Sequence, residues 1–579
     1  MTLRLLAVLA GTVWSMAGQS AVQQVRPLSV RGLENVQALA RLFGYVRYFH
    51  PSDSAAGTDW EELAVHSVQT VEEAQSPQDL ASALTTVFAP VSTGVAVFPT
   101  GSTAPRTSLK PGPYLIEWRH HGVGLSQSNT YYSERVTRPA NGNPAPDFIR
   151  ADLPGGVSCV VPRVLYTDAP GVFRLNRFAE ARPRSSDDPR SGRLAAVIIA
   201  WNVLQHFYPY FDVVQTAWPQ ALVDAVKSAA TDDDPVQFLS TLRRMIAALH
   251  DGHGRVTMPS AVVSSPVGWD WVEGRLILTD VSLASDPALA PGDAVVSIDG
   301  RPAKEALAAA EAEISSATPQ WLLTRALGTG LHYSQPLGAI GEGPKSQPLV
   351  LEVEPFGAPG TTRKVMLERR SGRPTVEPRP QPIAELEPGV VYIDVTRATE
   401  DAFTADLGRI KGARGLIFDL RGYPNQEMGA GFIRYLSREP MHSARMLIPV
   451  VSYPDHRMTE FDRSGEWTLS PVTPYLTAKK VFLTDARAIS FSETIMGIVE
   501  QYRLGEIVGG PTAGTNGNLN PFTVPGGYQI SWTGMKVLKH DGSAHHGVGI
   551  IPTVRASRTR EGVANGRDEV LERALGLLK

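Results

Sequence analysis

Hydrophobic positions over residues 380–579 follow two alternating patterns. Short continuous apolar runs are separated by stretches in which apolar side chains recur at every third or fourth position. A continuous run bounded by turn residues predicts a buried strand, whereas the wider spacing predicts a helix. The runs are Val390–Val395, Gly415–Leu420, Val481–Thr484 and Glu506–Val508. Strands that alternate with helices are typical of an α/β core, which we place at residues 376–579.

One strand-to-helix transition in this region carries a serine. The apolar run at Val481 breaks into small and polar residues that lead to Ser490. A helical pattern follows at Ile495, Met496, Ile498 and Val499. A hydroxyl at such a turn lies at the mouth of a sheet, beside a helix N-terminus that stabilises negative charge, which suits a nucleophile. The same residues fit an ordinary helix start, with Ser490 as N-cap and Glu493 completing a capping box.

Two stretches of the first half match each other without a gap. Phe43 to Gly94 aligns with Trp201 to Gly252, and the alignment places Trp60 on Trp218. Apolar residues in both copies are spaced by three and four, so both copies are predicted to be small helical units. We place the first copy at residues 28–100 and the second in a helical subdomain at residues 194–262.

The two copies differ where chemistry is expected. The second ends in the sequence Leu249-His-Asp-Gly-His253, whereas the first ends in Val91-Ser-Thr-Gly-Val95. His253 therefore has Val95 as its counterpart. If this motif carries chemistry, the first copy is a degenerate structural appendage.

The remaining segments complete a multidomain α+β architecture. Residues 101–181 contain short β-type runs and are predicted to form an antiparallel β unit, and residues 182–193 form a polar linker. Within residues 263–375, the stretch Pro291–Gly300 reads as turn, strand and turn before a helix from Ala303. This layout is PDZ-like, and a PDZ domain receives an extended peptide at a strand edge. A plain β-hairpin is the alternative.

Composition and the N-terminal segment narrow the range of possible functions. The 579 residues carry a net charge of −3 without a Lys/Arg cluster, which argues against a nucleic-acid surface. Residues 1–17 hold Arg4, an apolar run and a small-residue ending, and predict a signal peptide that is cleaved on export. The apolar run is too short for a permanent membrane span, although an uncleaved anchor is the alternative. Cys159 is the single cysteine, which excludes an intramolecular disulfide and a Cys-based metal site.

Five stretches, taken in order, resemble peptidase family S41, the C-terminal-processing and tricorn-type serine proteases. They are Leu249–His253, Pro291–Asp293, Asp419–Pro424, Ser490–Glu493 with Gly509–Gly514, and Gly547–Pro552. The resemblance covers residues 195–579. It implies a peptidase without a cofactor that acts on peptides or unfolded proteins. It also implies that Ser490 is the nucleophile and that Ser492 points elsewhere.

The general base departs from the pattern of many relatives, which pair the serine with a lysine. Thr515 stands at the lysine position, and Lys480 and Lys536, the nearest lysines, lie outside the motif. A threonine hydroxyl is too weakly basic to deprotonate serine. The tricorn-like branch instead uses a histidine from the segment before the PDZ domain, and His253 stands at the matching place. An imidazole with a pKa near 6.5 can accept and return a proton near neutral pH.

The groups that support the base are also altered. The tricorn-like branch has a serine directly before the histidine and an acidic residue late in the chain, whereas this chain has Gly252 and the pair His545-His546. The sequence leaves Asp251, Glu493 and His546 as candidates to orient the imidazole.

The oxyanion site is altered as well. The family places a glycine pair after the Asp-Leu-Arg turn, where this chain has Asn425 and Gln426. We expect the backbone N–H groups of Asn425 or Gln426 and of Phe491 to serve as donors, because a backbone N–H survives any substitution other than proline. A plain strand-ending turn, with Arg421 in a structural salt bridge, is the alternative.

Two other functions compete with a serine endopeptidase. His250 and His253, with Asp251, resemble a metal pair, but Gly252 lies between the histidines and no glutamate follows at metalloprotease spacing. We therefore expect no metal. A catalytically inactive peptide- or ligand-binding protein on the same scaffold is the stronger alternative. The sequence leaves open the oligomeric state, the substrate and the role of residues 22–190.

Overall fold

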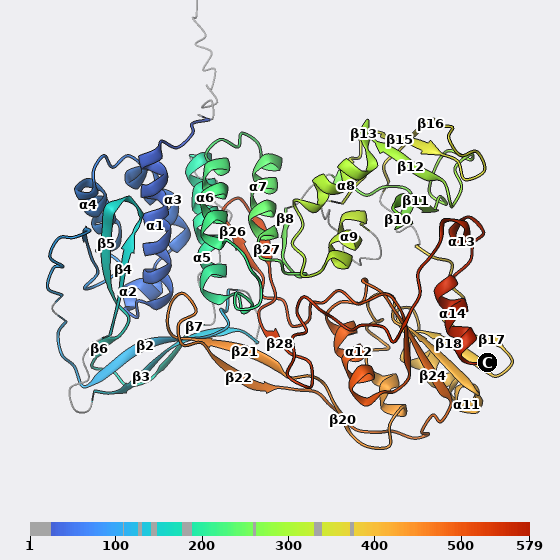
Figure 1. Ribbon diagram of the computed structural model, residues 1–579. Helices are drawn as coiled ribbons and strands as arrows, with labels where there is room; N and C mark the ends of the chain where they lie inside the picture. The colour runs from blue at the N-terminus through green and yellow to red at the C-terminus, as the bar shows by residue number, and fades with distance from the viewer. Residues whose placement is uncertain are drawn as a thin grey trace, which may run out of the picture.

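The computed structural model describes most of the chain (Figure 1). The described ranges are residues 25–107, 109–125, 130–140, 147–175, 188–258, 262–328, 339–370 and 376–579. The predicted signal segment, residues 1–17, lies outside them. Within these ranges, every helix falls short of the length and apolar character that a membrane span requires.

The core is a six-stranded sheet whose strands lie side by side in chain order. They are β17 (Ile383–Glu387), β18 (Val390–Asp394), β19 (Gly415–Asp419), β24 (Lys479–Thr484), β25 (Glu506–Gly509) and β29 (Val554–Arg555). All neighbours pair in parallel except β17, which pairs antiparallel to β18. The four strands predicted from continuous apolar runs are confirmed.

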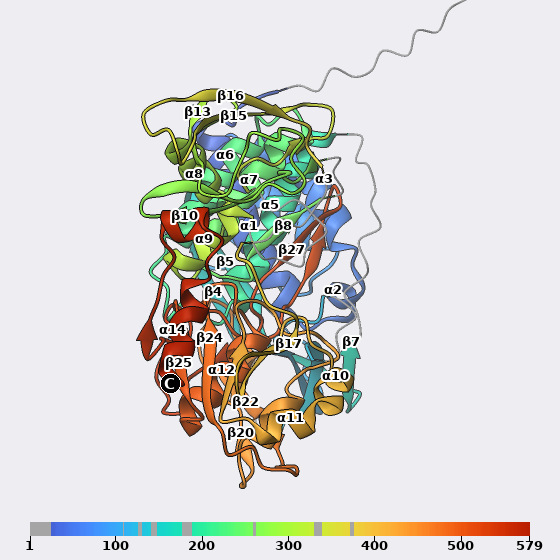
Figure 2. The same ribbon diagram turned by 90° about the vertical axis from the view of Figure 1, so that its right-hand side faces the viewer.

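Helices cover both faces of this sheet (Figure 2), which explains why its strands are continuously apolar. Along β18, Val391 and Ile393 face the core that contains α12 (Phe491–Tyr502), while Val390 and Tyr392 face α14 (Glu569–Leu577). Two further helices, α10 (Glu400–Ala405) and α11 (Leu407–Gly412), connect β18 to β19. Parallel strands place their carboxyl ends at one edge, so the turns after β19 and β24 are neighbours.

Each copy of the helical repeat folds as three matched helices. The first copy has α1 (Val30–Phe49), α3 (Trp60–Glu72) and α4 (Pro77–Phe88), with the short α2 (Asp53–Gly57) between them. The second has α5 (Pro189–Phe207), α6 (Trp218–Ala229) and α7 (Pro235–Ala247). Because α5 begins at Pro189, the linker expected over residues 182–193 is already helical over its last residues, which is a correction.

The copies pack on each other around a local two-fold axis. Gly44 of α1 and Asn202 of α5 are counterparts in the repeat, and a Cβ on Gly44 would lie 1.9 Å from the Asn202 side-chain oxygen. The Asn202 amide donates to the carbonyls of Ala40 and Ile198, both at 2.8 Å, and these two residues are also counterparts. Contacts between a residue and its own counterpart are typical of an isologous interface.

The duplication extends into the strands that follow each helical copy. In the first copy β1 (Ala96–Pro99) pairs with the hairpin of β4 (Phe148–Leu153) and β5 (Val157–Pro162). In the second, β8 (Arg255–Thr257) pairs in the same way with the hairpin of β26 (Phe522–Val524) and β27 (Tyr528–Ser531). The second hairpin comes from the peptidase core, far away in sequence.

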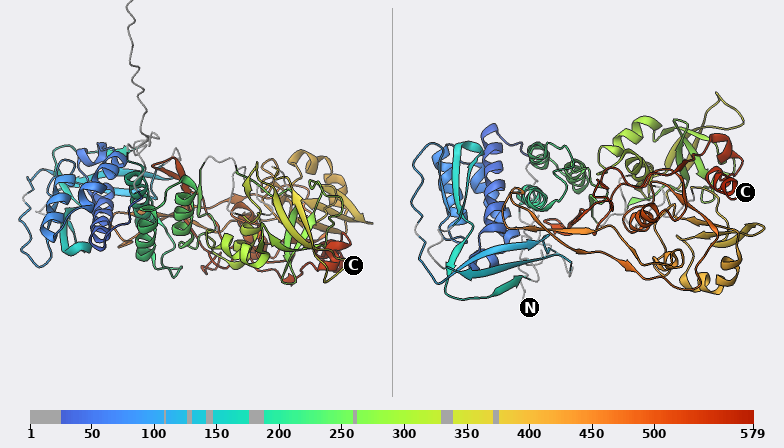
Figure 3. Two further views of the ribbon diagram at one scale, coloured as in Figure 1. Left: turned by 90° about the horizontal axis from the view of Figure 1, so that it is seen from above. Right: turned by 60° about the horizontal axis from the view of Figure 1, so that its bottom comes forward.

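A long sheet joins the N-terminal half to the core (Figure 3). Its central pair is β2 (Tyr114–His121) and β21 (Met446–Val451), which run antiparallel. On one side lie β3 (Tyr132–Pro139), β6 (Leu165–Thr167) and β7 (Val172–Leu175), and on the other β22 (Glu460–Gly465) and β28 (Lys536–Val537). The predicted β unit at residues 101–181 is therefore shared between this sheet and the β1–β5–β4 sheet.

The predicted PDZ-like segment forms a separate layer above the core (Figure 1). Its sheet contains β10 (Gly268–Val272), β11 (Arg275–Asp280), β12 (Ala294–Ile298), β13 (Arg301–Pro302), β15 (Leu349–Glu354) and β16 (Arg363–Leu367). Two helices, α8 (Ala303–Glu311) and α9 (Pro319–Leu327), pack with it. The short α13 (Arg560–Ala564) anchors the layer to the core, since Arg560 donates to the Gly292 carbonyl at 2.8 Å.

Candidate active site

Ser490 occupies a strained turn between β24 and α12. Its φ of 57° and ψ of −112° lie in a region that residues other than glycine rarely adopt. Such a conformation costs of order 1–3 kcal/mol and persists only when the surroundings enforce it. The Ser490 N–H donates to the carbonyl of Thr515 at 3.0 Å and to the Glu493 carboxylate at 3.3 Å. The side chain is half-buried, at the carboxyl edge of the sheet.

Glu493 fastens this turn to the loop at residues 511–515. Its buried carboxylate accepts hydrogen bonds from the Thr512 hydroxyl at 2.5 Å and from the N–H groups of Gly514 and Thr515 at 2.7 and 2.9 Å. Together with the Ser490 N–H, these donors occupy the carboxylate. Glu493 therefore supports the serine turn and makes no hydrogen bond to the His253 ring.

Thr515 connects the serine turn to the histidine loop. Its carbonyl accepts from Ser490, and its Oγ1 accepts from the Gly252 N–H at 3.2 Å. A Cβ on Gly252 would lie 2.3 Å from that oxygen, so a larger residue at position 252 does not fit. The Trp321 indole holds the same loop by donating to the Gly252 carbonyl at 3.0 Å. Ser490 and His253 are thus brought to opposite sides of one threonine.

His253 lies in the turn between α7 and β8, and it is 7% exposed. Its Nδ1 is 2.9 Å from the Thr533 hydroxyl. Nε2 makes no hydrogen bond to any residue in the described ranges. Burial lowers the pKa of His253 below its usual value, and the carboxylates of Asp251 and Glu493 oppose that shift.

Asp251 organises the histidine loop from within. It is fully buried, and its carboxylate accepts from the N–H of His253 at 3.1 Å, the N–H of Thr533 at 2.6 Å and the hydroxyl of Thr533 at 2.5 Å. Its own N–H donates to the Ser315 hydroxyl at 2.9 Å. Of the candidate orienting groups, Asp251 is the one linked to the imidazole, through Thr533.

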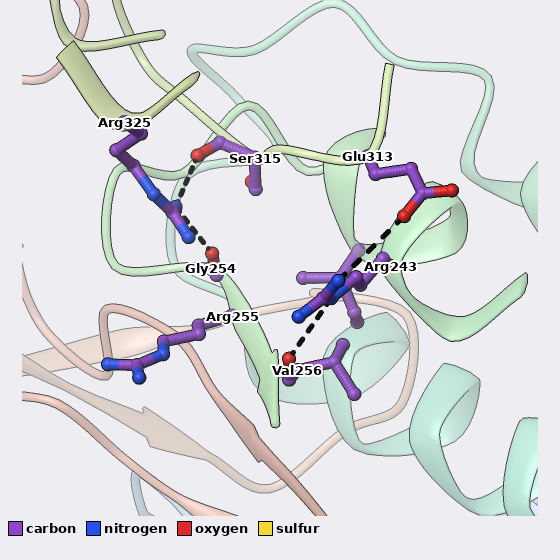
Figure 4. A pocket seen from close by; sticks show the side chains of 8 residues that line it. Arg243, Gly254, Arg255, Val256, Glu313, Ser315 and Arg325 are labelled. Atoms are coloured by element: carbon purple, nitrogen blue, oxygen red, sulfur yellow. Dashed lines mark hydrogen bonds and ion pairs between the residues drawn. The ribbon is translucent and has the colours of Figure 1, made fainter. Parts of the chain in front are cut away.

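A pocket behind this loop shows how the loop is held (Figure 4). Arg243, Gly254, Arg255, Ser315 and Arg325 are among its lining residues. The Arg325 guanidinium reaches two backbone carbonyls, those of Gly254 at 2.8 Å and Ser315 at 2.7 Å. These bonds fix the residue after His253 to the segment that precedes α9.

His546 supports the loop at another point. Its ring stacks on Tyr210, with centroids 4.0 Å apart, and its Nε2 is 3.0 Å from the carbonyl of His250. Burial lowers the pKa of His546. The neighbouring His545 has its Nε2 3.3 Å from the Glu493 carboxylate. The pair thus braces the two loops of the site and makes no hydrogen bond to the His253 ring.

The structure shows which of the N–H groups expected to be oxyanion donors are already hydrogen-bonded. The Asn425 N–H donates to the Val395 carbonyl at 3.0 Å, so it is already used, and this expectation is wrong. The N–H groups of Gln426 and Phe491 donate to no residue in the described part of the chain. Phe491 is the first residue of α12, where backbone N–H groups and the helix dipole favour negative charge.

The turn after β19 is held by a buried ion network. Arg421 donates to both Asp419 and Asp568, and Arg379 donates to the Arg421 carbonyl at 2.6 Å. Burial alone would raise the pKa of the Asp419 carboxyl, but the guanidinium groups of Arg379 and Arg421 hold it below its usual range. Arg421 therefore forms the structural salt bridge expected of it, and the network fixes the turn whose Tyr423 ring lies 6.1 Å from that of Phe491.

The described histidines were also candidates for a metal site. Across the described ranges, no three His, Cys, Asp or Glu side chains converge in a way that could hold an ion. His250 is exposed and has a φ of 51°, while His253 is buried against Thr533.

Residues 389–556 match the model of peptidase family S41. This segment spans most of the α/β core, and over it the chain is similar to family S41. The match confirms the predicted likeness to S41 over the core, and with it the class of serine-type peptidase, whose substrates are peptides or proteins. No curated protein matches the chain in sequence.

Two solved structures of mature CPAF share the fold over about two thirds of this chain. Mature CPAF has a TM-score of 0.54 at 14% identity, over 67% of this chain and 97% of CPAF. Mature CPAF complexed with lactacystin gives 0.53 at 14% identity, over 67% and 98% of the two chains. The photosystem II D1 C-terminal processing protease is 18% identical over 66% of this chain and 98% of its own, with a TM-score of 0.38.

Sequence reasoning missed Thr533. The residue follows β27 and belongs to no motif, and it reaches His253 only because β27 pairs with β8. The signal in the sequence that could have pointed to Thr533 lies in the internal duplication. Residues 157–162 have the same place in the first copy as residues 529–534 in the second, but this match is visible only after the strand pairs are aligned.

Proposed function

We propose that this chain is an exported serine endopeptidase that hydrolyses peptide bonds in peptides or unfolded proteins, with Ser490 as nucleophile and His253 as general base. One observation carries the assignment. Thr515 is hydrogen-bonded both to Ser490 and to Gly252, the residue before His253, which joins two segments that are distant in sequence. A purely structural serine N-cap would not need a histidine loop fastened beside it.

The proposed reaction follows from which group gives up a proton, Ser490, and which accepts it, His253. Ser490 attacks the peptide carbonyl while its proton passes to Nε2 of His253, and the imidazolium then protonates the leaving amine. The strained turn presents the serine side chain at the edge of the sheet. Thr515 does not replace the lysine of other relatives chemically; it links the serine turn to the loop that carries the base.

The N-terminus of α12 is proposed to stabilise the negative charge of the tetrahedral intermediate. The Phe491 N–H adjoins the nucleophile and the helix dipole points toward it. Gln426, in the turn after β19, is the second proposed donor. One such donor is worth about 10²–10³ in rate.

A fluorophosphonate probe tests the assignment without a known substrate. Wild-type protein should be labelled, Ser490→Ala should not, and His253→Ala should label weakly. Ser492→Ala is the matched control, because Ser492 is fully buried two positions away and should leave labelling unchanged. Labelling that survives in Ser490→Ala but not in Ser492→Ala would move the nucleophile. A folded wild type that is never labelled would favour the inactive peptide- or ligand-binding protein.

Export is proposed from the N-terminal sequence. Arg4, the apolar run and the small residues Ser15-Met-Ala17 are typical of a cleaved signal peptide. Mass spectrometry of the N-terminal peptide, after cell fractionation, checks this. Protein that keeps residues 1–17 and stays in the cytoplasm would contradict export.

A further inference from the structure

The donor and the acceptor can be assigned for each hydrogen bond that links Asp251, Thr533 and the His253 ring. The Asp251 carboxylate accepts, so the Thr533 hydroxyl must donate its single hydrogen to it at 2.5 Å. That hydroxyl can then only accept from the imidazole, which lies 2.9 Å away. Nδ1 of His253 therefore carries the hydrogen, and Nε2 keeps its lone pair. This is the tautomer that a general base acting through Nε2 requires.

We propose that Thr533 is the positioning residue of the general base, relaying the charge of Asp251 to the His253 ring. The inference rests on the proposed function, because it concerns how His253 performs that role. Thr533 fixes the tautomer and the ring orientation, and Asp251 stabilises the imidazolium that forms during attack. Asp251 and Thr533 thereby provide the support for the His253 imidazole that Gly252 and His546 do not provide.

The other candidate groups are committed elsewhere. The Glu493 carboxylate accepts from the serine turn and from the loop at residues 511–515. His546 is bonded to the His250 carbonyl. Of the three orienting candidates, Asp251 alone reaches the ring, and it does so through one hydroxyl.

The degenerate first copy gives independent support. Strand pairing places Cys159 opposite Val97 and Ser531 opposite Arg255, and Val97 and Arg255 are counterparts. Two positions further along, Val161 is therefore the counterpart of Thr533. Val95 and Thr93 are the counterparts of His253 and Asp251. The fold of this region is retained in both copies, yet the imidazole, the hydroxyl and the carboxylate occur only in the second. Three polar groups that are lost together point to one shared task.

Substitutions at Thr533 separate positioning from packing. Thr533→Val keeps the shape but removes the hydroxyl, and kcat should fall about 10²-fold or more with KM nearly unchanged. Thr533→Ser should restore kcat to within a few-fold. Thr523→Val, on the exposed face of the partner strand β26, is the matched control and should leave kcat unchanged. Asp251→Asn removes a charge that raises the pKa of His253, so the acid limb of kcat/KM should move to lower pH.

The outcomes distinguish this inference from the function on which it rests. If Ser490→Ala abolishes activity while Thr533→Val retains the wild-type kcat, the positioning role is overturned and the proposed function stands. If Thr533→Ser is as inactive as Thr533→Val at an equal melting temperature, the hydroxyl is not the operative group. A folded wild type that neither hydrolyses peptides nor reacts with the probe overturns both.

Discussion

The Thr515 hydroxyl lies where a side chain on Gly252 would have to be. A Cβ at position 252 would come within 2.3 Å of Oγ1 and 2.8 Å of the Thr515 Cβ. A side chain at position 252 and the threonine at position 515 are therefore mutually exclusive in this arrangement. The hydroxyl that contacts the His253 ring comes instead from Thr533, which follows β27.

This exclusion predicts the result of restoring the family serine. Gly252→Ser should lower both the melting temperature and kcat, because the new side chain displaces Thr515 and with it the Ser490 turn. The double variant Gly252→Ser/Thr515→Gly should recover part of the lost stability, since it removes both Oγ1 and Cβ of Thr515, the two clashing atoms. Thermal unfolding and probe labelling of the three proteins check this. A single Gly252→Ser variant that is more active than wild type would contradict it.

Activity should depend on pH through His253. The base must be neutral, so activity is lost as pH falls through its pKa. Burial lowers that pKa below 6.5, and the acid limb of kcat/KM should therefore have its midpoint below pH 6.5. A pH-jump back to 7.5 before assay separates protonation from unfolding. A midpoint above 6.5, or a flat profile to about pH 4.5, would count against His253.

Stability should fall over a similar range for a different reason. His50, His120 and His206 are buried in the helical core, and desolvation lowers the pKa of each, to about 4, 4 and 3. In the unfolded chain they bind protons from about pH 6.5 downward, so the folded state loses stability as pH falls below that value. Three such groups give a slope of up to about 4 kcal/mol per pH unit. Urea unfolding at several pH values measures it, and equal midpoints at pH 7 and 5 would disprove it.

The carboxylate of Glu493 should be essential for the serine turn. Glu493→Gln presents an NH₂ group to N–H donors, which leaves buried groups unpaired at a cost of about 1–3 kcal/mol each. We expect a large drop in melting temperature and loss of labelling at Ser490. Glu500→Gln on the same helix, which breaks a part-exposed pair with Lys539, is the control and should cost less than about 1 kcal/mol. Equal effects of the two substitutions would refute a special role for Glu493.

The crossing at the local two-fold axis predicts a strong effect of a single methyl group. Gly44→Ala would place its Cβ 1.9 Å from the Asn202 side chain and should separate α1 from α5. A helix-interior glycine with open space, Gly497, should instead gain about 0.5–1 kcal/mol on substitution by alanine. Chemical denaturation of both variants compares them directly. If Gly44→Ala is as stable as Gly497→Ala, the close crossing is not tight in solution.

Sequence patterns predicted the helices and strands well wherever the burial of a segment can be read from its own apolar residues. The strands at β18, β19, β24 and β25 were recognisable because both faces are buried, which requires continuous apolar runs. The helical copies were recognisable because amphipathic spacing persists in both. The linker at residues 182–193 was misjudged because Pro189 and the polar residues after it suit the first turn of α5.

The site was predicted in part. Ser490 and His253 belong to local motifs, and the structure places their loops on either side of Thr515. Asn425 was assigned wrongly, because a sequence does not show that its N–H donates to Val395. The proposed role of Thr533 could not be read from its neighbours in sequence, since its two partners lie in the turn before β8, which is distant in sequence.

By itself, the sequence determined the likeness to family S41, the strand and helix content of the core, and the two residues proposed to react. These features depend on side-chain chemistry and on periodicities of two to four residues, which are local. Only the tertiary structure decided which groups surround the imidazole, and that the N-terminal half repeats the strands as well as the helices of the second. Both depend on strand pairing, in which the partner is chosen by burial and hydrogen bonding across the whole chain, and no local pattern encodes that choice.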